Sequence, residues 1–86
     1  MADYIISFRR SAEKDLRKLD AVNRRRVLRA IDTLAPQPRP SGCRKLVGSE
    51  DAFRIRVGDY RVIYTVSDAV LIVSIESIRH RREAYR

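Results

Sequence analysis

The chain has 86 residues and a formal net charge of +8, with 44% hydrophobic and 35% charged residues. A chain of this length is expected to fold as one domain, over residues 1–86, and its hydrophobic content excludes the composition of a disordered protein. Because the sequence contains neither an apolar run of about 18–20 residues nor an initial signal-peptide pattern, we expect a soluble, cytoplasmic protein.

Arginine dominates the basic side chains. Of the 19 lysines and arginines only Lys14, Lys18 and Lys45 are lysines, which leaves 16 arginines. A coding bias toward arginine would raise this number, but it would not explain where the arginines lie. Arginine binds phosphate through two parallel hydrogen bonds and stacks on bases. We therefore expect a polyanionic partner, which could be a nucleic acid, an acidic protein or an anionic membrane.

The residues that most often bind metals are scarce. The chain has one cysteine, Cys43, and one histidine, His80. An internal disulfide is therefore excluded, and a zinc site built from three or four protein ligands is not expected. We expect chemistry that needs no metal or other cofactor, and we interpret Cys43 as a small apolar residue that fills space in the core.

The first half of the chain predicts a strand followed by two helices. Residues 4–8 are mostly β-branched or aromatic, as in a strand. We expect Ser11 to cap the first helix and Asp20 the second. Each helix has one apolar stripe, formed by Ala12, Leu16 and Leu19 in the first and by Val27, Ala30, Ile31 and Leu34 in the second. The two helices should be antiparallel.

The second half predicts a sheet. The prolines of residues 35–42 end the second helix, because each disfavours helical geometry in the residue before it. Strands are expected at roughly 52–57, 60–67 and 69–77, joined by a type II′ turn at Gly58-Asp59 and by a second turn at Ser67-Asp68. The last strand is apolar on both faces, so we place it inside the sheet.

Residues 79–86 are expected to form a short terminal helix. The predicted fold is α+β, with the order β-α-α-β-β-β and a mainly antiparallel sheet packed against an N-terminal helical hairpin. In the terminal helix Arg81 and Tyr85 would be four residues apart, presenting a cation and an aromatic hydroxyl that can stack on an unpaired base. Periodicity alone explains Tyr85 equally well as a core anchor, and His80 alone is better explained as a surface histidine.

Arginines alternate with apolar residues in residues 51–64. In a two-residue hairpin Val57 pairs with Tyr60 and Arg56 with Arg61, so the apolar residues share one face. The other face carries three arginines, Arg54, Arg56 and Arg61. Directly opposed like charges are destabilising by about 0.2–1 kcal/mol. Three converging arginines therefore favour a phosphate-binding surface over side chains that extend into water or pair with acidic residues.

This order of elements, together with the segments GDYRVIY and HRREAYR, resembles the RelE/ParE toxin superfamily, and in particular its RelE-type mRNA interferases. The resemblance implies the toxin of a toxin–antitoxin system, a metal-independent endoribonuclease that cuts mRNA in the ribosomal A site by attack of the ribose 2′-OH. It also implies a cognate RelB-like antitoxin as partner, besides the ribosome and mRNA, with no direct DNA binding except through the antitoxin.

The resemblance further implies catalytic roles for Arg54, Arg56, Arg61, Arg81 and Tyr85. Family members often have lysines where Arg54 and Arg56 stand, and arginine cannot accept the 2′-OH proton because it is never deprotonated. The four arginines would stabilise the pentacovalent phosphate. Tyr85 would stack on or orient the nucleotide, or act as the base, with His80 as the second choice of base.

A basic helix surface is the expected contact with ribosomal RNA. It comprises Lys18, Arg24, Arg25 and Arg26. Such a charge run is equally consistent with a solvated helix face. The ribosome could impose the in-line geometry that a site without a metal or a strong base requires. Two other functions remain open, a ParE-like inhibitor of DNA gyrase with the same fold and a non-catalytic RNA-binding module.

Overall fold

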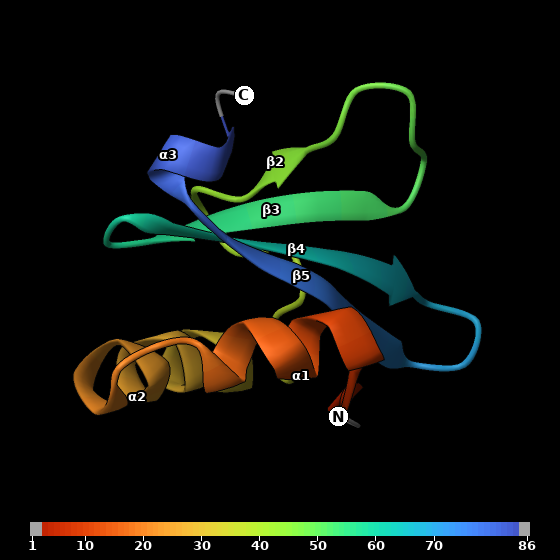
Figure 1. Ribbon diagram of the computed structural model, residues 1–86. Coiled ribbons are helices and arrows are strands. Elements are labelled where there is room, and N and C mark those ends of the chain that lie inside the picture. Colours follow the sequence, from red (N-terminus) through yellow and green to blue (C-terminus); the bar gives the residue numbers. More distant parts are fainter. Residues whose placement is uncertain (1–2, 85–86) are drawn as a thin grey trace.

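Five strands and three helices follow one another along residues 3–84, the part of the chain that the computed structural model describes (Figure 1). The first half contains β1 (Ile5–Phe8), α1 (Arg10–Arg17) and α2 (Ala21–Asp32). The second half contains β2 (Arg44–Lys45), β3 (Ala52–Val57), β4 (Tyr60–Ser67), β5 (Ile72–His80) and α3 (Arg81–Ala84). The expected order of elements is confirmed, with β2 as an additional short strand. No helix of this part is long and apolar enough to span a lipid bilayer.

The five strands form one sheet in the order β1-β5-β4-β3-β2. The edge strand β1 is parallel to β5, and the other neighbours are antiparallel. Strand β5 lies inside the sheet, between β1 and β4, as its apolar sequence predicted. The mainly antiparallel α+β fold is therefore confirmed.

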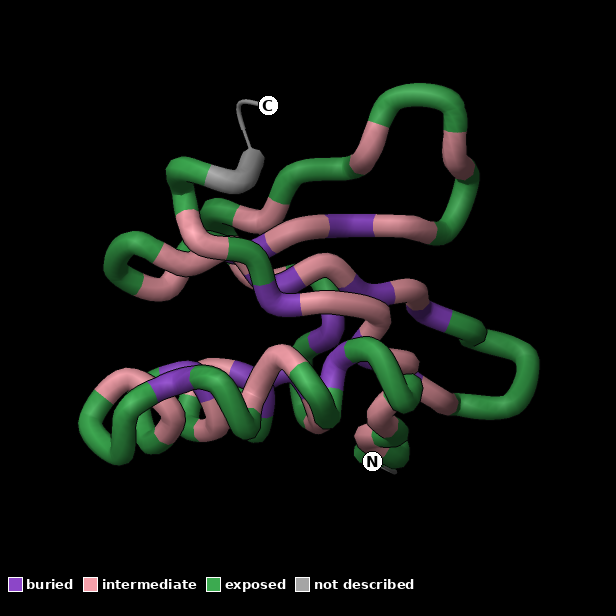
Figure 2. The backbone as a smooth tube through the Cα atoms, in the orientation of Figure 1, coloured by how far each residue is buried: buried purple, intermediate pink, exposed green. Residues whose placement is uncertain are grey.

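The core lies between the sheet and the two long helices. Figure 1 shows α1 and α2 together on one side of the sheet and α3 at the hairpin end, away from them. Figure 2 marks the buried residues, most of which belong to α1, α2, β3, β4 and β5. The core residues among them are Ala12, Leu19, Val27, Ile31, Leu34, Phe53, Ile55, Val62, Tyr64, Val66, Val73, Ile75 and Ile78. Cys43 is partly buried and packs against this cluster, which agrees with its interpretation as filler.

The hairpin of β3 and β4 has the predicted register. Val57 pairs with Tyr60 and Arg56 with Arg61, which leaves a two-residue loop. Gly58 has φ of +60°, a left-handed value that glycine adopts at no steric cost. A positive φ at the first loop residue alone is the signature of the type II′ turn.

The last strand begins and ends later than predicted. We expected residues 69–77, whereas β5 spans Ile72–His80 and residues 68–71 form the preceding turn, with φ of 56° at Leu71. Pairing with β4 continues to the hairpin, where His80 lies opposite Tyr60. Because this ladder extends to His80, the terminal helix begins only at Arg81.

Neither expected helix cap forms in the expected way. Helix α1 begins at Arg10, so the residue at its N-cap is Arg9 rather than Ser11. Asp20 does occupy the N-cap position of α2, but its carboxylate accepts a hydrogen bond from the Asn23 amide at 2.6 Å instead of from the backbone. The prediction of Ser11 as a cap was wrong, and its hydroxyl has another role.

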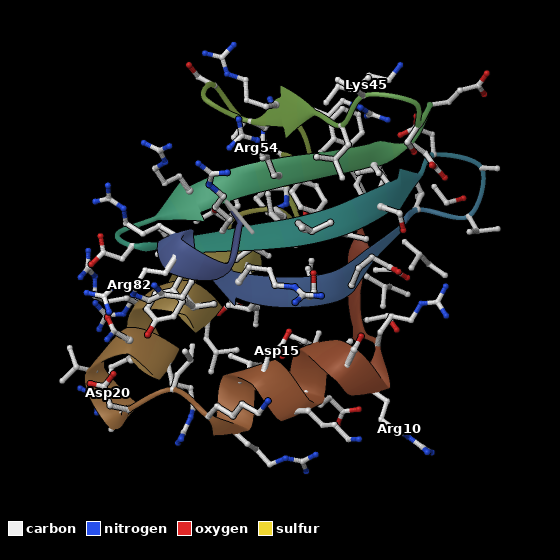
Figure 3. All side chains as sticks on the ribbon, turned by 45° about the horizontal axis from the view of Figure 1, so that its top comes forward. Arg10, Asp15, Asp20, Lys45, Arg54 and Arg82 are labelled. Carbon is white, nitrogen blue, oxygen red and sulfur yellow. The ribbon has the colours of Figure 1, made fainter. Side chains whose placement is uncertain are left out.

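Helix α1 is attached to β5 by two polar side chains. The Ser11 hydroxyl donates to the carbonyl of Glu76 at 2.6 Å, and Asp15 accepts from the N–H of Ile78 at 2.9 Å. Figure 3 shows Asp15 on the side of α1 that faces the sheet. The β4–β5 register shifts beside Glu76, and β1 has already ended opposite Ile75. The helix therefore satisfies backbone groups that lack a strand partner.

Arg24 connects the two long helices. Its Nε donates to the carbonyl of Leu16 at 3.1 Å, and its NH2 group donates to the carbonyl of Leu19 at 2.7 Å. These carbonyls lie at the C-terminal end of α1, where the backbone lacks helical partners and favours a cation. Arg24 is thus a structural residue of the helical hairpin, although the sequence suggested an RNA contact.

Tyr64 anchors the proline-containing loop from inside the core. Its side chain is fully buried, and its hydroxyl donates to the carbonyl of Pro38 at 2.8 Å. Burial raises the pKa of this phenol above its ordinary value.

We expect Tyr64→Phe to lower the free energy of unfolding by about 1–3 kcal/mol, because the Pro38 carbonyl loses its buried donor. Because the pKa of Tyr64 is raised in the folded state, this residue makes its full contribution to the free energy of unfolding below about pH 10. The contribution declines as the pH rises above that value, where the phenol ionises in the unfolded chain but not in the folded one. Urea denaturation at several pH values should show a smaller alkaline loss in Tyr64→Phe than in the wild type. Parallel pH profiles would contradict this.

Neighbouring arginines on α2 provide a matched pair. Arg24→Ala should lower the free energy of unfolding by about 1–3 kcal/mol, because two carbonyls of α1 lose a charged donor. Arg25→Ala removes the same charge from an exposed position and should change stability by less than about 0.5 kcal/mol. Equal effects in urea denaturation would show that net charge, and not the contacts with α1, determines the result.

Candidate phosphate-binding site

A pocket of about 200 Å³ opens at the hairpin end of the sheet. We call it the turn pocket; its lining residues are Arg56, Gly58, Asp59, Tyr60, Arg61 and Arg81. The three arginines come from β3, β4 and α3, elements that are separated along the chain. The structure therefore brings together three of the residues that the sequence predicted as catalytic.

Backbone geometry fixes the positions of these arginines. Arg56 and Arg61 lie directly opposite each other on the face of the sheet that points away from α1 and α2. Arg81 follows the last residue of β5, and its backbone N–H donates to the carbonyl of Asp59 at 2.7 Å. The turn and the start of α3 thus hold each other in place.

A further guanidinium lies on the helix side of the turn. A Cβ atom at Gly58 would be 3.3 Å from the NH2 group of Arg26, so this arginine of α2 contacts the turn. The sequence predicted Arg26 as an RNA contact, and the structure places it beside the turn pocket. Lys18 at the C-cap of α1 and Arg25 on α2 are exposed and make no ion pair with another described residue.

Two arginines of the same surface were missed in the sequence. Arg79 pairs with Arg61, so Arg56, Arg61 and Arg79 form a row across three strands. Arg44 pairs with Arg54 on the other side of β3. A strict period of two from the buried Val73 and Ile75 would place Arg79 on the helix side of the sheet. The irregularity at Glu76 reverses the faces, so the local period did not indicate Arg79. A two-residue strand has no such period, so no sequence signal indicated Arg44.

Arg54 belongs to a neighbouring pocket of about 270 Å³. We call it the strand pocket; it is lined by Gly42, Arg44, Arg54 and Arg56, so that Arg56 lines both pockets. Within the described part of the chain, Arg44, Arg54 and Arg56 make no ion pair or side-chain hydrogen bond. The acidic residue Glu76 of β5 pairs with Arg9 at 3.2 Å instead. These three arginines are thus available to an external anion.

The structure does not bring His80 into the turn pocket. The register with Tyr60 places it on the helix side of the sheet, where the two rings meet edge to face with centroids 5.2 Å apart. The His80 Nδ1 accepts a hydrogen bond from the backbone N–H of Arg82 at 3.2 Å. His80 lines a separate hollow beside Arg81. Tyr85, the other residue considered for proton transfer, lies outside the described residues.

Residues 6–85 match the family described as the ParE toxin of type II toxin–antitoxin systems, parDE. A curated relative named as toxin RelE1 from Methanocaldococcus jannaschii is 34% identical over 76 residues, which cover 85% of this chain and 84% of the relative. The family and the relative thus carry the names of the two branches, ParE and RelE.

Solved structures of RelE toxins and RelBE complexes have the same fold. The archaeal RelE–RelB complex from Pyrococcus horikoshii matches with a TM-score of 0.81 and 32% identity, covering 91% of this chain and 94% of the other. The RelBE2 toxin–antitoxin complex from Mycobacterium tuberculosis matches with a TM-score of 0.82 and 27% identity, covering 92% and 99%. The similarity extends over almost the whole described fold.

Proposed function

The chain belongs to the RelE/ParE family of toxins of type II toxin–antitoxin systems, and we propose on that basis that it is a ribosome-dependent endoribonuclease that cleaves messenger RNA in the ribosomal A site. The observation that carries the proposal is the turn pocket, where guanidinium groups from three elements surround a space large enough for a phosphate. Such fixed cations stabilise charge that develops in a transition state.

In the proposed reaction the 2′-oxygen of a ribose attacks the adjacent phosphorus while the bond from phosphorus to the 5′-oxygen breaks. The products are a 2′,3′-cyclic phosphate and a free 5′-hydroxyl. Arg56, Arg61 and Arg81 stabilise the added negative charge of the pentacovalent phosphate, and Arg54 contributes from the strand pocket.

The proton of the 2′-hydroxyl needs an acceptor other than arginine. We assign Tyr85 to this step or to orienting the nucleotide, because an arginine-rich site would favour its phenolate. His80 is the second candidate, since its ordinary pKa suits proton transfer, but it lies on the helix side of the sheet with Nδ1 engaged. The 5′-oxygen takes a proton from water as it leaves, because arginine does not give up a proton.

Ribosome dependence follows from what this site lacks. With no strong base beside the turn pocket in the described residues, the rate depends on holding the 2′-oxygen, the phosphorus and the leaving oxygen in line. The ribosome would supply this alignment by constraining the mRNA. Lys18 and Arg25, together with Arg26 beside the turn, are the residues that we assign to contacts with ribosomal RNA.

The antitoxin is the second expected partner. The two solved complexes pair a RelE toxin with a RelB antitoxin, and we propose a RelB-like protein for this chain as well. A net charge of +8 favours an acidic segment that covers the arginine surface and blocks the turn pocket. DNA binding would then reside in the antitoxin.

The first test is primer extension on mRNA from translating ribosomes and on naked mRNA. We expect cuts within A-site codons only when ribosomes are present. Arg61→Ala should lower the cleavage rate by about 10²–10³-fold, the effect of removing one donor to a transition-state oxyanion. Lys45→Ala, an exposed cation whose strand position faces the helix side of the sheet, is the charge-matched control and should cleave normally.

The alternative outcome is specific. If no sample yields cuts while translation continues, the nuclease proposal fails, and inhibition of DNA gyrase becomes the better function. The ParE name of the matching family is the observation that favours this alternative. A supercoiling assay on the same protein would then decide it.

The proton acceptor can be identified from the pH dependence of single-turnover cleavage. We expect Tyr85→Phe to lower the rate by about 10²–10⁴-fold and to remove the pH-dependent limb that the base produces. His80→Ala should have the smaller effect, because His80 lies outside the turn pocket. An unchanged rate and profile in either variant removes that residue from proton transfer.

A further inference from the structure

We propose that the strand pocket binds a second phosphate of the same single-stranded RNA, next to the phosphate in the turn pocket. The inference rests on the proposed function only in taking RNA as the ligand. It gives Arg44 a role in binding RNA. Arg54 would position the RNA in addition to stabilising the negative charge of the transition state. The turn pocket and the strand pocket are each lined by three arginines.

The shape of the strand pocket suits a phosphate. Its volume is about 270 Å³, and three of its four lining residues are arginines. The fourth is Gly42, where a Cβ atom would meet nothing within 4 Å, so this side of the hollow is open to a ligand. Arginine side chains can each donate two parallel hydrogen bonds to a phosphate.

Arg54 of the strand pocket and Arg56, which lines both pockets, are separated by about one phosphate step. Arg54 and Arg56 are two residues apart on β3 and project from the same face. Two residues of an extended strand span about 6.6–6.8 Å, similar to the step between consecutive phosphates of an extended RNA strand. Arg56 lines both pockets and would contact both phosphates.

Electrostatics provide a reason for the site to take an anion. Arg44 of β2 lies directly opposite Arg54 of β3. On the other side of β3, Arg56 lies directly opposite Arg61 of β4, so β3 has an opposed pair of arginines with each of its neighbours. Directly opposed like charges are destabilising. Within residues 3–82 no carboxylate pairs with Arg44, Arg54 or Arg56, so a bound phosphate would relieve the repulsion.

The loop that leads to Arg44 is held in place. Arg39 bonds both carboxylate oxygens of Asp68, at 3.2 and 2.8 Å, and its guanidinium lies 5.3 Å from the centre of the Phe53 ring. These contacts, with the hydrogen bond from Tyr64 to Pro38, attach the loop to the sheet just before Gly42 and β2. Arg44 is therefore presented from a fixed segment, which lowers the cost of ordering it on binding.

The test measures binding of RNA that cannot react. A dinucleotide and a trinucleotide without terminal phosphates contain one and two phosphodiesters, and 2′-O-methyl groups prevent cleavage. Isothermal titration of the full chain at fixed ionic strength gives the affinity gained from the second phosphate. We expect the trinucleotide to bind the wild type about threefold to tenfold more tightly than the dinucleotide, and Arg44→Ala to lose most of that gain.

The controls separate a defined site from diffuse attraction. Lys45→Ala removes the same charge from the adjacent residue of β2 and should keep the gain. Arg44→Ala should bind the dinucleotide within about twofold of the wild type, with an unchanged urea midpoint showing that it is folded. The proposal is overturned if the wild type gains nothing from the second phosphate, if Arg44→Ala keeps the gain, or if both variants lose it equally.

These results do not depend on catalysis. If ribosomal cleavage fails while the gain at Arg44 is present, the proposed function is wrong and the two-phosphate site stands. If cleavage occurs and the gain is absent, only the second phosphate site is lost. Should an acidic peptide bind at Arg44 while the trinucleotide shows no gain, the surface serves a protein partner and the RNA proposal is refuted.

Discussion

The two-residue turn at Gly58-Asp59 sets the register of β3 against β4, and the rest of the structure depends on that register. A shift of one residue would turn the core side chains of both strands to solvent and bring charged ones under the helices. As built, Phe53, Val62 and their neighbours pack on α1 and α2, while the arginines face away. The same turn therefore determines both which residues form the hydrophobic core and which form the cationic surface. A change of register would alter both sets of residues together.

A second constraint acts where β5 extends beyond the end of its neighbour β1. Beyond Ile75 one side of β5 has no strand partner, and Ser11 and Asp15 of α1 bond its backbone instead. This support lets β5 continue beside β4 as far as His80. Arg81, which follows β5, then lies beside the turn. By supporting β5, helix α1 therefore also helps to complete the turn pocket with a residue from the C-terminal part of the chain.

Sequence reasoning succeeded where a local period was strong. The alternation in residues 51–64 gave the correct register of Arg56 and Arg61, and the helical stripes identified the buried residues of α1 and α2. It failed where tertiary contacts decide. The extent of β5 depends on pairing with β4, the two-residue β2 has no period, and the hydrogen bonds of Arg24 join residues that only the fold brings together. Arg79 and Arg44 were missed for these reasons.

On the proposed function, the row of arginines across β3, β4 and β5 has opposite effects on activity and on folding. Like charges directly opposite each other in a sheet are destabilising, so replacing Arg56 or Arg79 by an apolar residue would favour folding while lowering the proposed activity. Random mutation of such a gene would find inactive proteins that fold at least as well as the active one. The arginine row would then be retained only while toxicity itself is selected. That selection requires an antitoxin, because without one the toxin would kill the host that carries its gene.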